Sequence, residues 1–377
     1  MIIKEVFAKK IFDSRKEPTI EVSVNGQKAS SPSGKSKGKY ETPSYHKSLD
    51  WNIKAINSFA ELKGLNVNSF ADLHIIEDLI KEKFKLKDAK QFGANSLFAL
   101  ESAILKSIAK QEHKELWQVI NSNAKKIPVP LGNVIGGGLH SHNKDHPIFQ
   151  EFLLAPKGKN MAKNFNIMKK VYHELGKLVK SSSINDEGAW QTSLDEKKVL
   201  DRLKIFSRVV NIGIDIAASS FYKNNLYRYK KDKLNKEEQI NYINDLIEKY
   251  NLLYAEDPLN EKDFSGFSKI SKKCLVVGDD LTVTHIDRLQ KAIKNKSINA
   301  MIIKPNQNGS LIEVKKIFEI CKKNRIKTIL SHRSGETLDS AIADYAFAFG
   351  ADFIKCGIAT PYREIKLKRL IEIEKGL

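Results

Sequence analysis

Six short apolar runs in the C-terminal half of this chain each stop at a single charged or ionisable residue. The residues at these stops are Asp215, Glu256, Asp279, Lys304, His332 and Lys355, separated by 41, 23, 25, 28 and 23 positions. Each interval is long enough for a strand, a loop and a helix, and strand–helix alternation builds a parallel sheet. If the sheet closes into a barrel, the carboxyl ends of its strands meet at one mouth, where barrel enzymes do their chemistry. The spacing therefore predicts that three carboxylates, two lysines and a histidine converge on one pocket.

The first third of the chain has a different pattern. Residues 1–30 alternate apolar and polar positions around an Asn-Gly turn, which predicts a β-meander. From position 50 to position 120, apolar residues recur at three- and four-residue spacing, which predicts helices. The prolines of KKIPVP then interrupt the helical pattern. Because 377 residues exceed one ordinary core, we expect an α+β domain over 1–126 and a β/α barrel over 127–377.

The composition predicts a soluble, cytoplasmic protein. Charged residues make up 29% of the chain, and no run approaches the roughly 20 apolar residues that a membrane helix needs. The first residues are charged and contain no hydrophobic signal core, so we expect them to belong to the folded protein. Cys274, Cys321 and Cys356 have no short spacing, which argues against a disulfide framework and against a zinc ribbon.

The formal net charge of +19 is spread along the chain. Basic residues outnumber acidic ones by 22 to 15 in positions 1–126 and by 42 to 30 in the remainder. A nucleic-acid-binding protein usually gathers its charge in one patch or arm. We therefore favour incidental surface charge, and we keep a basic face for nucleic acid as an alternative. In either case a positive field helps to attract an anionic substrate.

Three of the six stops are carboxylates on consecutive expected strands. Crowded carboxylates resist ionisation unless a cation lies among them. Because Asp215, Glu256 and Asp279 offer only oxygen ligands, they suit a hard divalent ion, so we expect Mg²⁺ rather than Zn²⁺. Lys304 and Lys355 stand further along the same mouth. Nearby cations disfavour the protonated form of a lysine, so an amine there can act as a base.

The motifs around these positions resemble those of the enolases along nearly the whole chain. They stand in the family's order: DSRKEPTIEV, SPSGKSKGKYE, GANSLFALESA, GNVIGGGLH, FQEFLLAP, NDEGAW, DIAASSFY, AEDPL, GDDLTVT, IKPNQNGSL, SHRSGET and FIKCG. The resemblance implies an enolase-type, TIM-like (β/α)8 barrel preceded by a smaller α+β capping domain. It also implies a homodimer formed partly through the N-terminal domain. The implied activity is that of phosphopyruvate hydratase, the glycolytic lyase that reversibly dehydrates 2-phospho-D-glycerate to phosphoenolpyruvate.

Two Mg²⁺ ions per active site are implied by the same resemblance. Asp215, Glu256 and Asp279 match the ligands of the first ion. Ser36, in the loop PSGKSKG, matches the serine that helps to bind the second ion when substrate arrives. Two cations on the substrate carboxylate would stabilise the charge that develops there when the neighbouring proton leaves.

The resemblance also assigns the acid and base residues by motif. Lys304 matches the general base at C2, and Glu187 matches the general acid that protonates the departing C3 hydroxyl. Glu151 matches a residue that assists the acid, while Lys355 matches the holder of the substrate carboxylate.

The remaining matches are substrate-binding residues. His332 supports the hydroxyl side, and Arg333 and Ser334 match the phosphate holders, Arg through its charged fork. Gln150 and Asp280 are expected to orient these groups.

The match to the family is imperfect at several places, and two of them bear directly on the substrate loops. Lys35 and Lys37 stand where the family usually has Ala and Thr, and these new cations could change substrate affinity. In GGGLHSHNKDHPIFQEF the local pattern favours His140 as the family's mobile-loop histidine, whereas spacing back from Gln150 favours His142; we prefer His140.

Two other functions remain as alternatives. One is another enolase-superfamily enzyme that removes a proton alpha to a carboxylate, although such enzymes need not carry the Pro-Ser-Gly loop or the His-Arg-Ser phosphate holder. The other is an enolase-like protein that binds RNA or another polyanion through its surplus lysines. We expect a small phosphorylated acid as substrate and do not favour nucleic acid.

Overall fold

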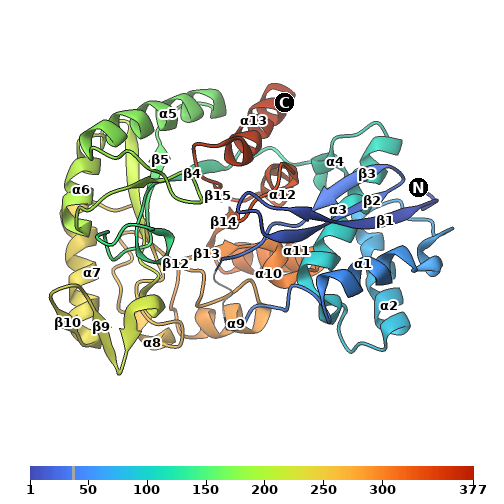
Figure 1. Ribbon diagram of the computed structural model, residues 1–377, viewed down its shortest axis with the longest axis horizontal. Coiled ribbons are helices and arrows are strands. Elements are labelled where there is room, and N and C mark those ends of the chain that lie inside the picture. Colours follow the sequence, from blue (N-terminus) through green and yellow to red (C-terminus); the bar gives the residue numbers. More distant parts are fainter. Residues whose placement is uncertain (36–38) are drawn as a thin grey trace.

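The chain begins with the β-meander that the sequence predicts. The computed structural model describes residues 1–35 and 39–377 (Figure 1). Strands β1 (Val6–Phe12), β2 (Pro18–Val24) and β3 (Gln27–Ser30) pair antiparallel in the order β1–β2–β3. Asn25 and Gly26 join β2 to β3 with φ angles of 47° and 78°. Positive φ at both positions is what a two-residue hairpin turn requires, which explains the Asn-Gly pair.

Four helices complete this part of the chain, as the helical spacing predicts. They are α1 (Leu49–Asn57), α2 (Leu73–Phe84), α3 (Ala94–Gln111) and α4 (Leu116–Asn121), with short 3-10 turns η1 (Ala60–Leu62), η2 (Phe70–Asp72) and η3 (Ala89–Phe92). Helix α3 is buried along nearly its whole length and packs on β2 and β3. Its buried positions include polar residues such as Asn95, Glu101 and Ser102 as well as the apolar ones.

Eight strands form a closed barrel. They are β4 (Val129–Gly136), β5 (Glu151–Pro156), β7 (Val210–Asp215), β11 (Tyr254–Glu256), β12 (Leu275–Gly278), β13 (Ala300–Ile303), β14 (Lys327–Ser331) and β15 (Phe353–Lys355). Neighbouring strands pair around the ring, and β15 pairs with β4 to close it. Six of these strands end at, or one residue before, the six charged stops, so the predicted barrel is confirmed.

One strand runs against the others. β5 is antiparallel to both β4 and β7, because it follows β4 without an intervening α-helix. The first residue of β5, rather than its last, therefore lies at the mouth, and Glu151 stands opposite Asp215 in the register of β5 and β7.

Helices surround the barrel (Figure 1). They are α5 (Met161–Leu178), α6 (Glu196–Lys204), α7 (Lys236–Tyr250), α8 (Phe264–Phe267), α9 (Ile286–Lys294), α10 (Pro305–Asn308), α11 (Leu311–Lys323), α12 (Ala341–Ala348) and α13 (Pro361–Lys375). Minor elements are η4 (Gly138–His140), β6 (Trp190–Gln191), η5 (Ala218–Phe221), β8 (Tyr222–Lys223), β9 (Leu226–Arg228) and β10 (Lys233–Leu234). The barrel interior is filled by Leu131, Leu153, Ala155, Tyr254, Val277, Ala300, Ile302 and Ile329, so the barrel is a packed core and not a pore. Within 1–35 and 39–377, no helix has both the length and the hydrophobicity to cross a membrane.

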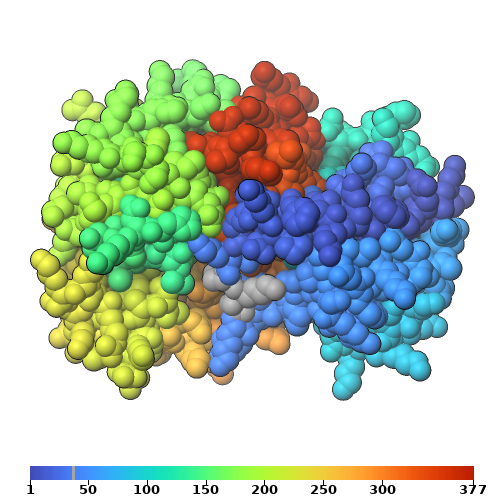
Figure 2. All heavy atoms as spheres, in the orientation of Figure 1, coloured from blue at the N-terminus to red at the C-terminus, as the bar shows by residue number. Residues whose placement is uncertain are grey.

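The N-terminal domain packs directly on the barrel. Figure 2 shows the blue N-terminal segment lying against the red C-terminal part of the chain. Asn306 after β13 donates to Asn95 Oδ1 of α3 at 2.9 Å. Lys106 of α3 forms an ion pair with Asp339 at 2.7 Å. These contacts bring the loop before α1 to the barrel mouth.

Candidate active site

A cavity of about 250 Å³ opens where the N-terminal domain meets the barrel mouth. From the N-terminal side it is lined by Gly34, Lys35, Lys39, Tyr40 and Glu41. From the barrel it is lined by residues that include Asp215, Asp279, Lys304, His332 and Lys355, five of the six strand-end residues. The sixth, Glu256, is fully buried and contacts Lys355. The structure thus brings together residues that lie far apart in sequence.

One buried ammonium lies among three carboxylates. Lys355 Nζ is 2.8 Å from Glu256 Oε2, 2.9 Å from Glu151 Oε2 and 3.1 Å from Asp215 Oδ2. Burial, followed by the charge of Asp215, raises the pKa of Glu256 well above its ordinary value. Burial also raises the pKa of Asp215, although Lys355 opposes it. Three carboxylates therefore share one ammonium, and a single lysine cannot neutralise all three negative charges.

Asp279 and Lys304 form a second ion pair at the ends of neighbouring strands. Burial is the largest single influence and disfavours the charged form of each, but the neighbouring charges together outweigh it. The pKa of Asp279 is lowered, chiefly by Lys304, and the pKa of Lys304 is raised, chiefly by Asp279. The sequence interpretation expected a lysine that is often neutral. Arg333 and Lys355 do lower the pKa of Lys304, but Asp279, which raises it, has a stronger effect than either of them.

The carboxylate set fits a hard divalent cation. Glu256 Oε1 and Asp279 Oδ1 are buried and have no hydrogen-bond partner among the described residues. A buried carboxylate oxygen without a partner is costly, and a cation among such oxygens removes that cost. Asp215 and Glu256 pair with Lys355, whereas Asp279 pairs with Lys304.

A neighbouring aspartate orients this acidic loop. Asp257 accepts hydrogen bonds from the backbone N–H groups of Asp279 and Asp280, at 3.1 and 2.6 Å. Carboxylate oxygens of Asp257, Asp279 and Asp280 lie within 4.8 Å of one another. Burial, followed by Asp279, raises the pKa of Asp280 to about 7. The sequence interpretation overlooked Asp257, and its only signal was its position directly after Glu256.

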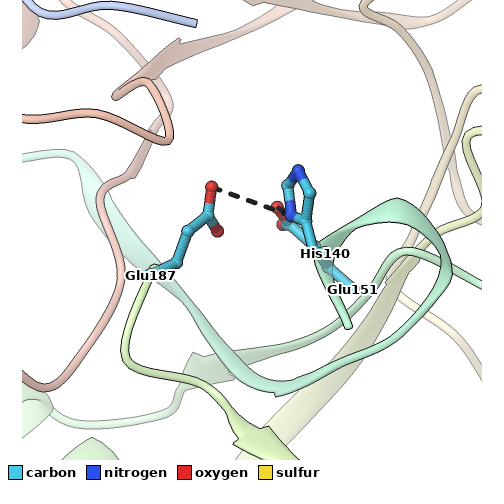
Figure 3. A group of neighbouring side chains, drawn as sticks. All are labelled: His140, Glu151 and Glu187. Carbon is cyan, nitrogen blue, oxygen red and sulfur yellow. Dashed lines mark ion pairs between the residues drawn. The ribbon is translucent and has the colours of Figure 1, made fainter. Parts of the chain in front are cut away.

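A second group of side chains lies on the β4–β5 side of the pocket (Figure 3). It consists of His140, Glu151 and Glu187. His140 Nδ1 lies 3.4 Å from Glu151 Oε1 and 3.8 Å from Glu187 Oε1. Asn133 of β4 donates to Glu187 Oε2 at 3.2 Å. Burial opposes ionisation of Glu187, but the positive charges of His140, Arg363 and Lys355 lower its pKa to about 2.

Glu187 is aimed by a tight turn. Gly188 follows it with a φ of 80°, and a Cβ at that position would lie 2.6 Å from the carbonyl oxygen of Ala359. Only glycine fits there, because both the conformation and the space exclude a side chain.

The two candidate loop histidines lie in different places. His140 lines the cavity beside Glu151 and Glu187. His142 is half exposed, and its Nε2 lies 3.2 Å from Asp186 Oδ1. This position favours His140, whose role in catalysis stays a prediction.

Residues after β14 face the N-terminal loop. Arg333 Nη2 lies 2.9 Å from Glu41 Oε2, and Ser334 Oγ accepts from the backbone N–H of Lys35 at 2.7 Å. A Cβ on Gly34 would lie 2.0 Å from Arg333 Nη2, so the loop approaches the guanidinium as closely as glycine allows. Ser36 and Lys37 lie outside the described residues.

Gln150 and Arg363 complete the surroundings. Gln150 Nε2 donates to Asp215 Oδ2 at 3.4 Å. Arg363 of α13 is fully buried and donates to the carbonyl oxygens of Arg333 and Ser334 at 2.7 and 2.6 Å. Sequence reasoning missed Arg363, because a basic residue in a Lys-rich helix has the pattern of a solvated face.

Comparisons with known proteins agree with this architecture. The family model described as "Enolase, N-terminal domain" matches residues 3–120, and that described as "Enolase, C-terminal TIM barrel domain" matches residues 124–377. The chain is 34% identical over 403 residues to the "Enolase" of Natronomonas pharaonis, with 99% of both chains covered. It is 35% identical over 402 residues to the "Enolase" of Methanocorpusculum labreanum, with 99% of each covered. It is also 35% identical over 402 residues to that of Archaeoglobus fulgidus, covering 100% of this chain and 98% of the relative.

Proposed function

The chain belongs to the enolase family and is a lyase that reversibly dehydrates 2-phospho-D-glycerate to phosphoenolpyruvate, and we propose that the pocket at the barrel mouth performs this reaction. The observation that carries the proposal is the meeting of Lys304 and Glu187 in one cavity with the carboxylates of the barrel mouth. Lys304 follows β13, whereas Glu187 lies in the turn before β6, which pairs with β4. Strands β13 and β4 are three places apart around the eight-stranded ring. Base and acid can therefore approach a substrate from different sides. Neither alternative function is favoured, because the similarity to enolases spans the full chain.

The proposed ligands of the first Mg²⁺ are Asp215, Glu256 and Asp279. The unpaired oxygens of Glu256 and Asp279 support this assignment. Mg²⁺ held there would supply positive charge to the substrate carboxylate, which makes the neighbouring C–H group more acidic. We propose that Ser36 helps to hold a second Mg²⁺ that arrives with the substrate.

Lys304 is the proposed base that removes the proton from C2. It directly follows β13 and lines the pocket with 17% of its side chain exposed, so its amine is largely shielded from bulk water. Asp279 keeps it protonated while their ion pair lasts. Lys304 is therefore competent as a base only when the charge of Asp279 is engaged elsewhere, and the charges of Arg333 and Lys355 then favour the neutral amine.

Glu187 is the proposed acid that gives a proton to the departing C3 hydroxyl. The charges of His140, Arg363 and Lys355 together outweigh burial and lower the pKa of Glu187 to about 2, which favours its ionised form. A substrate with several negative charges would offset these cations and raise the pKa of Glu187. Glu151 is the proposed assistant of Glu187, and the contacts of His140 with both carboxylates support this pairing.

The substrate's two anionic ends have separate proposed partners. Lys355 holds the carboxylate end, deep among the strand ends. Arg333 and Ser334 hold the phosphate, with the Arg333 fork kept in place by Glu41 and by Asn306 Oδ1 at 3.3 Å. Gln150, beside Asp215, keeps that carboxylate oriented, and His332 supports the hydroxyl side.

We further propose a cytoplasmic homodimer formed partly through the N-terminal domain. Phe7 and Phe12 on β1 leave 56% and 65% of their surfaces exposed, and Leu338 nearby in the fold leaves 58%. Adjacent exposed apolar residues mark interaction surfaces, and Phe12 and Leu338 line the same surface hollow. Sedimentation velocity should give a dimer mass, and a Phe12→Asp variant should shift the protein to monomer; an unchanged dimer would place the interface elsewhere.

A direct spectrophotometric assay tests the proposed activity. The purified chain with 2-phosphoglycerate and Mg²⁺ should produce the ultraviolet absorbance of phosphoenolpyruvate, and EDTA should stop the reaction. Absence of product with Mg²⁺ in excess would contradict the proposed function.

A further inference from the structure

A buried arginine makes its contacts with the segment that carries the phosphate and hydroxyl binders. Arg363 lies on α13 with no exposed surface. Its Nη1 lies 2.6 Å from His332 Nδ1 and 2.7 Å from the carbonyl oxygen of Arg333, and its Nη2 lies 2.6 Å from the carbonyl oxygen of Ser334. One guanidinium therefore fixes three consecutive residues of the pocket.

The contact with His332 determines where the imidazole proton sits. A guanidinium has five N–H donors, no acceptor, and stays protonated in proteins. His332 Nδ1 must therefore accept from Arg363 and carry a lone pair. The proton of a neutral ring then lies on Nε2, the nitrogen 4.0 Å from Glu187 Oε2.

The charges around the ring favour the neutral form as well. Burial and Arg363 hold the pKa of His332 well below its ordinary value, and Lys355 and Lys304 act in the same direction. Glu151 acts in the opposite direction, and Glu187 faces Nε2, but neither contacts Nδ1. A second proton would have to enter at Nδ1, where it would meet Arg363 Nη1.

We propose that Arg363 is a positioning residue that holds His332 as the neutral tautomer with its proton on Nε2. His332 then donates a hydrogen bond to a substrate oxygen on the hydroxyl side and takes no part in proton transfer. Such a neutral ring can stabilise charge on a substrate oxygen without exchanging its proton. The inference rests on the proposed function for its catalytic meaning, and it leaves Glu187 as the proton donor.

The tautomer can be measured without any turnover. The full chain, labelled with ¹⁵N-histidine, should show a protonated Nε2 and an unprotonated Nδ1 for His332, constant from about pH 5 to 8, where ordinary histidines titrate. The signal is assigned among the nine histidines by its loss in a His332→Gln variant. A protonated Nδ1, or a ring that titrates in this range, would overturn the proposal even if the enzyme is active. Conversely, an inactive enzyme with the expected spectrum would contradict the proposed function alone.

Substitutions distinguish control of the His332 tautomer from purely structural support of the loop after β14. Arg363→Met should release the tautomer, make His332 titrate and lower kcat by at least about tenfold. Arg363→Lys keeps a charged donor and should restore the Nε2–H form. The matched control is Lys366→Met: Lys366 is equally buried on α13 and binds the same loop, at Thr337 O (2.6 Å) and Glu336 Oε2 (2.8 Å), but contacts no histidine.

The control variant should leave the His332 spectrum unchanged whatever it does to stability. An unchanged tautomer in Arg363→Met, or the same spectral change in Lys366→Met, would overturn the proposal. If Arg363→Met does not fold, the spectrum of the unmodified chain still decides it.

Discussion

Lys355 Nζ lies 2.8 Å from Glu256 Oε2, at the ends of two strands that are 99 residues apart in sequence. The same ammonium contacts Asp215 and Glu151, so it serves carboxylates from β5, β7 and β11. Because β15 borders only β4 and β14, Lys355 reaches these partners across the barrel mouth. The charge balance of the site depends on this one side chain.

Replacing Lys355 by Met should leave three buried carboxylates without their cation. We expect the free energy of unfolding to fall by roughly 3–5 kcal/mol, the cost of breaking a buried ion pair from one side. Added Mg²⁺ should recover part of this loss, since a dication can replace the missing charge. Urea unfolding with and without Mg²⁺ measures both effects. In Lys366→Met, which breaks the buried pair with Glu336, Mg²⁺ should bring no such recovery.

Mg²⁺ should stabilise the folded chain, and the effect should depend on Glu256. A ligand that binds only the folded state raises Tm as its concentration exceeds Kd. Glu256→Gln keeps the side-chain volume but removes the charge, so we expect the Mg²⁺-dependent rise in Tm to disappear. Asp352→Asn is the control, since Asp352 pairs with Lys126 just before β15, at the opposite end of the barrel. Loss of the Mg²⁺ effect in both variants would contradict the metal site.

Lys304→Ala and Glu187→Gln should each lower kcat by roughly 10²–10⁴, the usual contribution of a positioned acid or base. Exchange of the C2 proton with solvent distinguishes the two roles. We expect Lys304→Ala to lose the exchange and Glu187→Gln to retain it, because the acid acts after C2 deprotonation. Lys177→Ala, which removes an exposed lysine of α5, is the control for general effects of charge. Exchange at a normal rate in Lys304→Ala would exclude this lysine as the base.

Gly34→Ala should weaken substrate binding without unfolding the chain. The added Cβ would lie 2.0 Å from Arg333 Nη2, so either the loop or the guanidinium must move. We expect KM to rise by about tenfold or more, because a displaced guanidinium loses its charged hydrogen bonds to phosphate. Gly376→Ala adds the same methyl group where the nearest atom is at 3.6 Å, and it should be neutral. Equal KM values for the two variants would contradict the proposed role of Arg333 in phosphate binding.

The Lys106–Asp339 pair should stabilise the domain contact only above acidic pH. Burial opposes ionisation of Asp339, but Lys106 and backbone N–H groups lower its pKa below the ordinary value of 3.8. The pair therefore contributes stability above pH 3.8, and the contribution is lost as pH falls through the lower, folded-state pKa.

We expect Asp339→Asn to cost roughly 1–3 kcal/mol at pH 7 and progressively less in strong acid. Urea unfolding at pH 7 and in strong acid measures this difference in the free energy of unfolding. Asp287→Asn, at an exposed position on α9, should cost little at either pH. A cost for Asp339→Asn that grows as pH falls would have the wrong sign and contradict the ion pair.

The strand ends could be predicted because their signal is local. An apolar run followed by a polar residue reports a buried strand and its end, whatever the rest of the chain does. The runs before Asp215, Glu256 and Lys355 are confirmed as β7, β11 and β15. The family was also readable, because its motifs lie in order and carry their own charged residues. The domain boundary near residue 126 and the roles of the site residues stay predictions.

The direction of a strand and the contact partners of a side chain could not be predicted from local sequence patterns. FQEFLLAP has the composition of any buried strand. Because no α-helix connects β4 to β5, β5 runs antiparallel and brings Glu151 to the mouth. Nothing in the residues around Arg363 indicates that it reaches His332, 31 positions away. The protonation of Lys304 was also unreadable, because it depends on the distance to Asp279.

By itself, the sequence determined which segments are strands, which residues end them, and therefore which chemical groups can meet at a barrel mouth. Hydrophobic periodicity and turn residues act over a few positions, so each segment carries that information alone. Tertiary structure decided which carboxylate holds which lysine, which histidine faces Glu187, and which nitrogen of His332 keeps its proton. These properties depend on burial and on distances of a few ångströms between residues far apart in the chain, and such distances exist only after the barrel has closed.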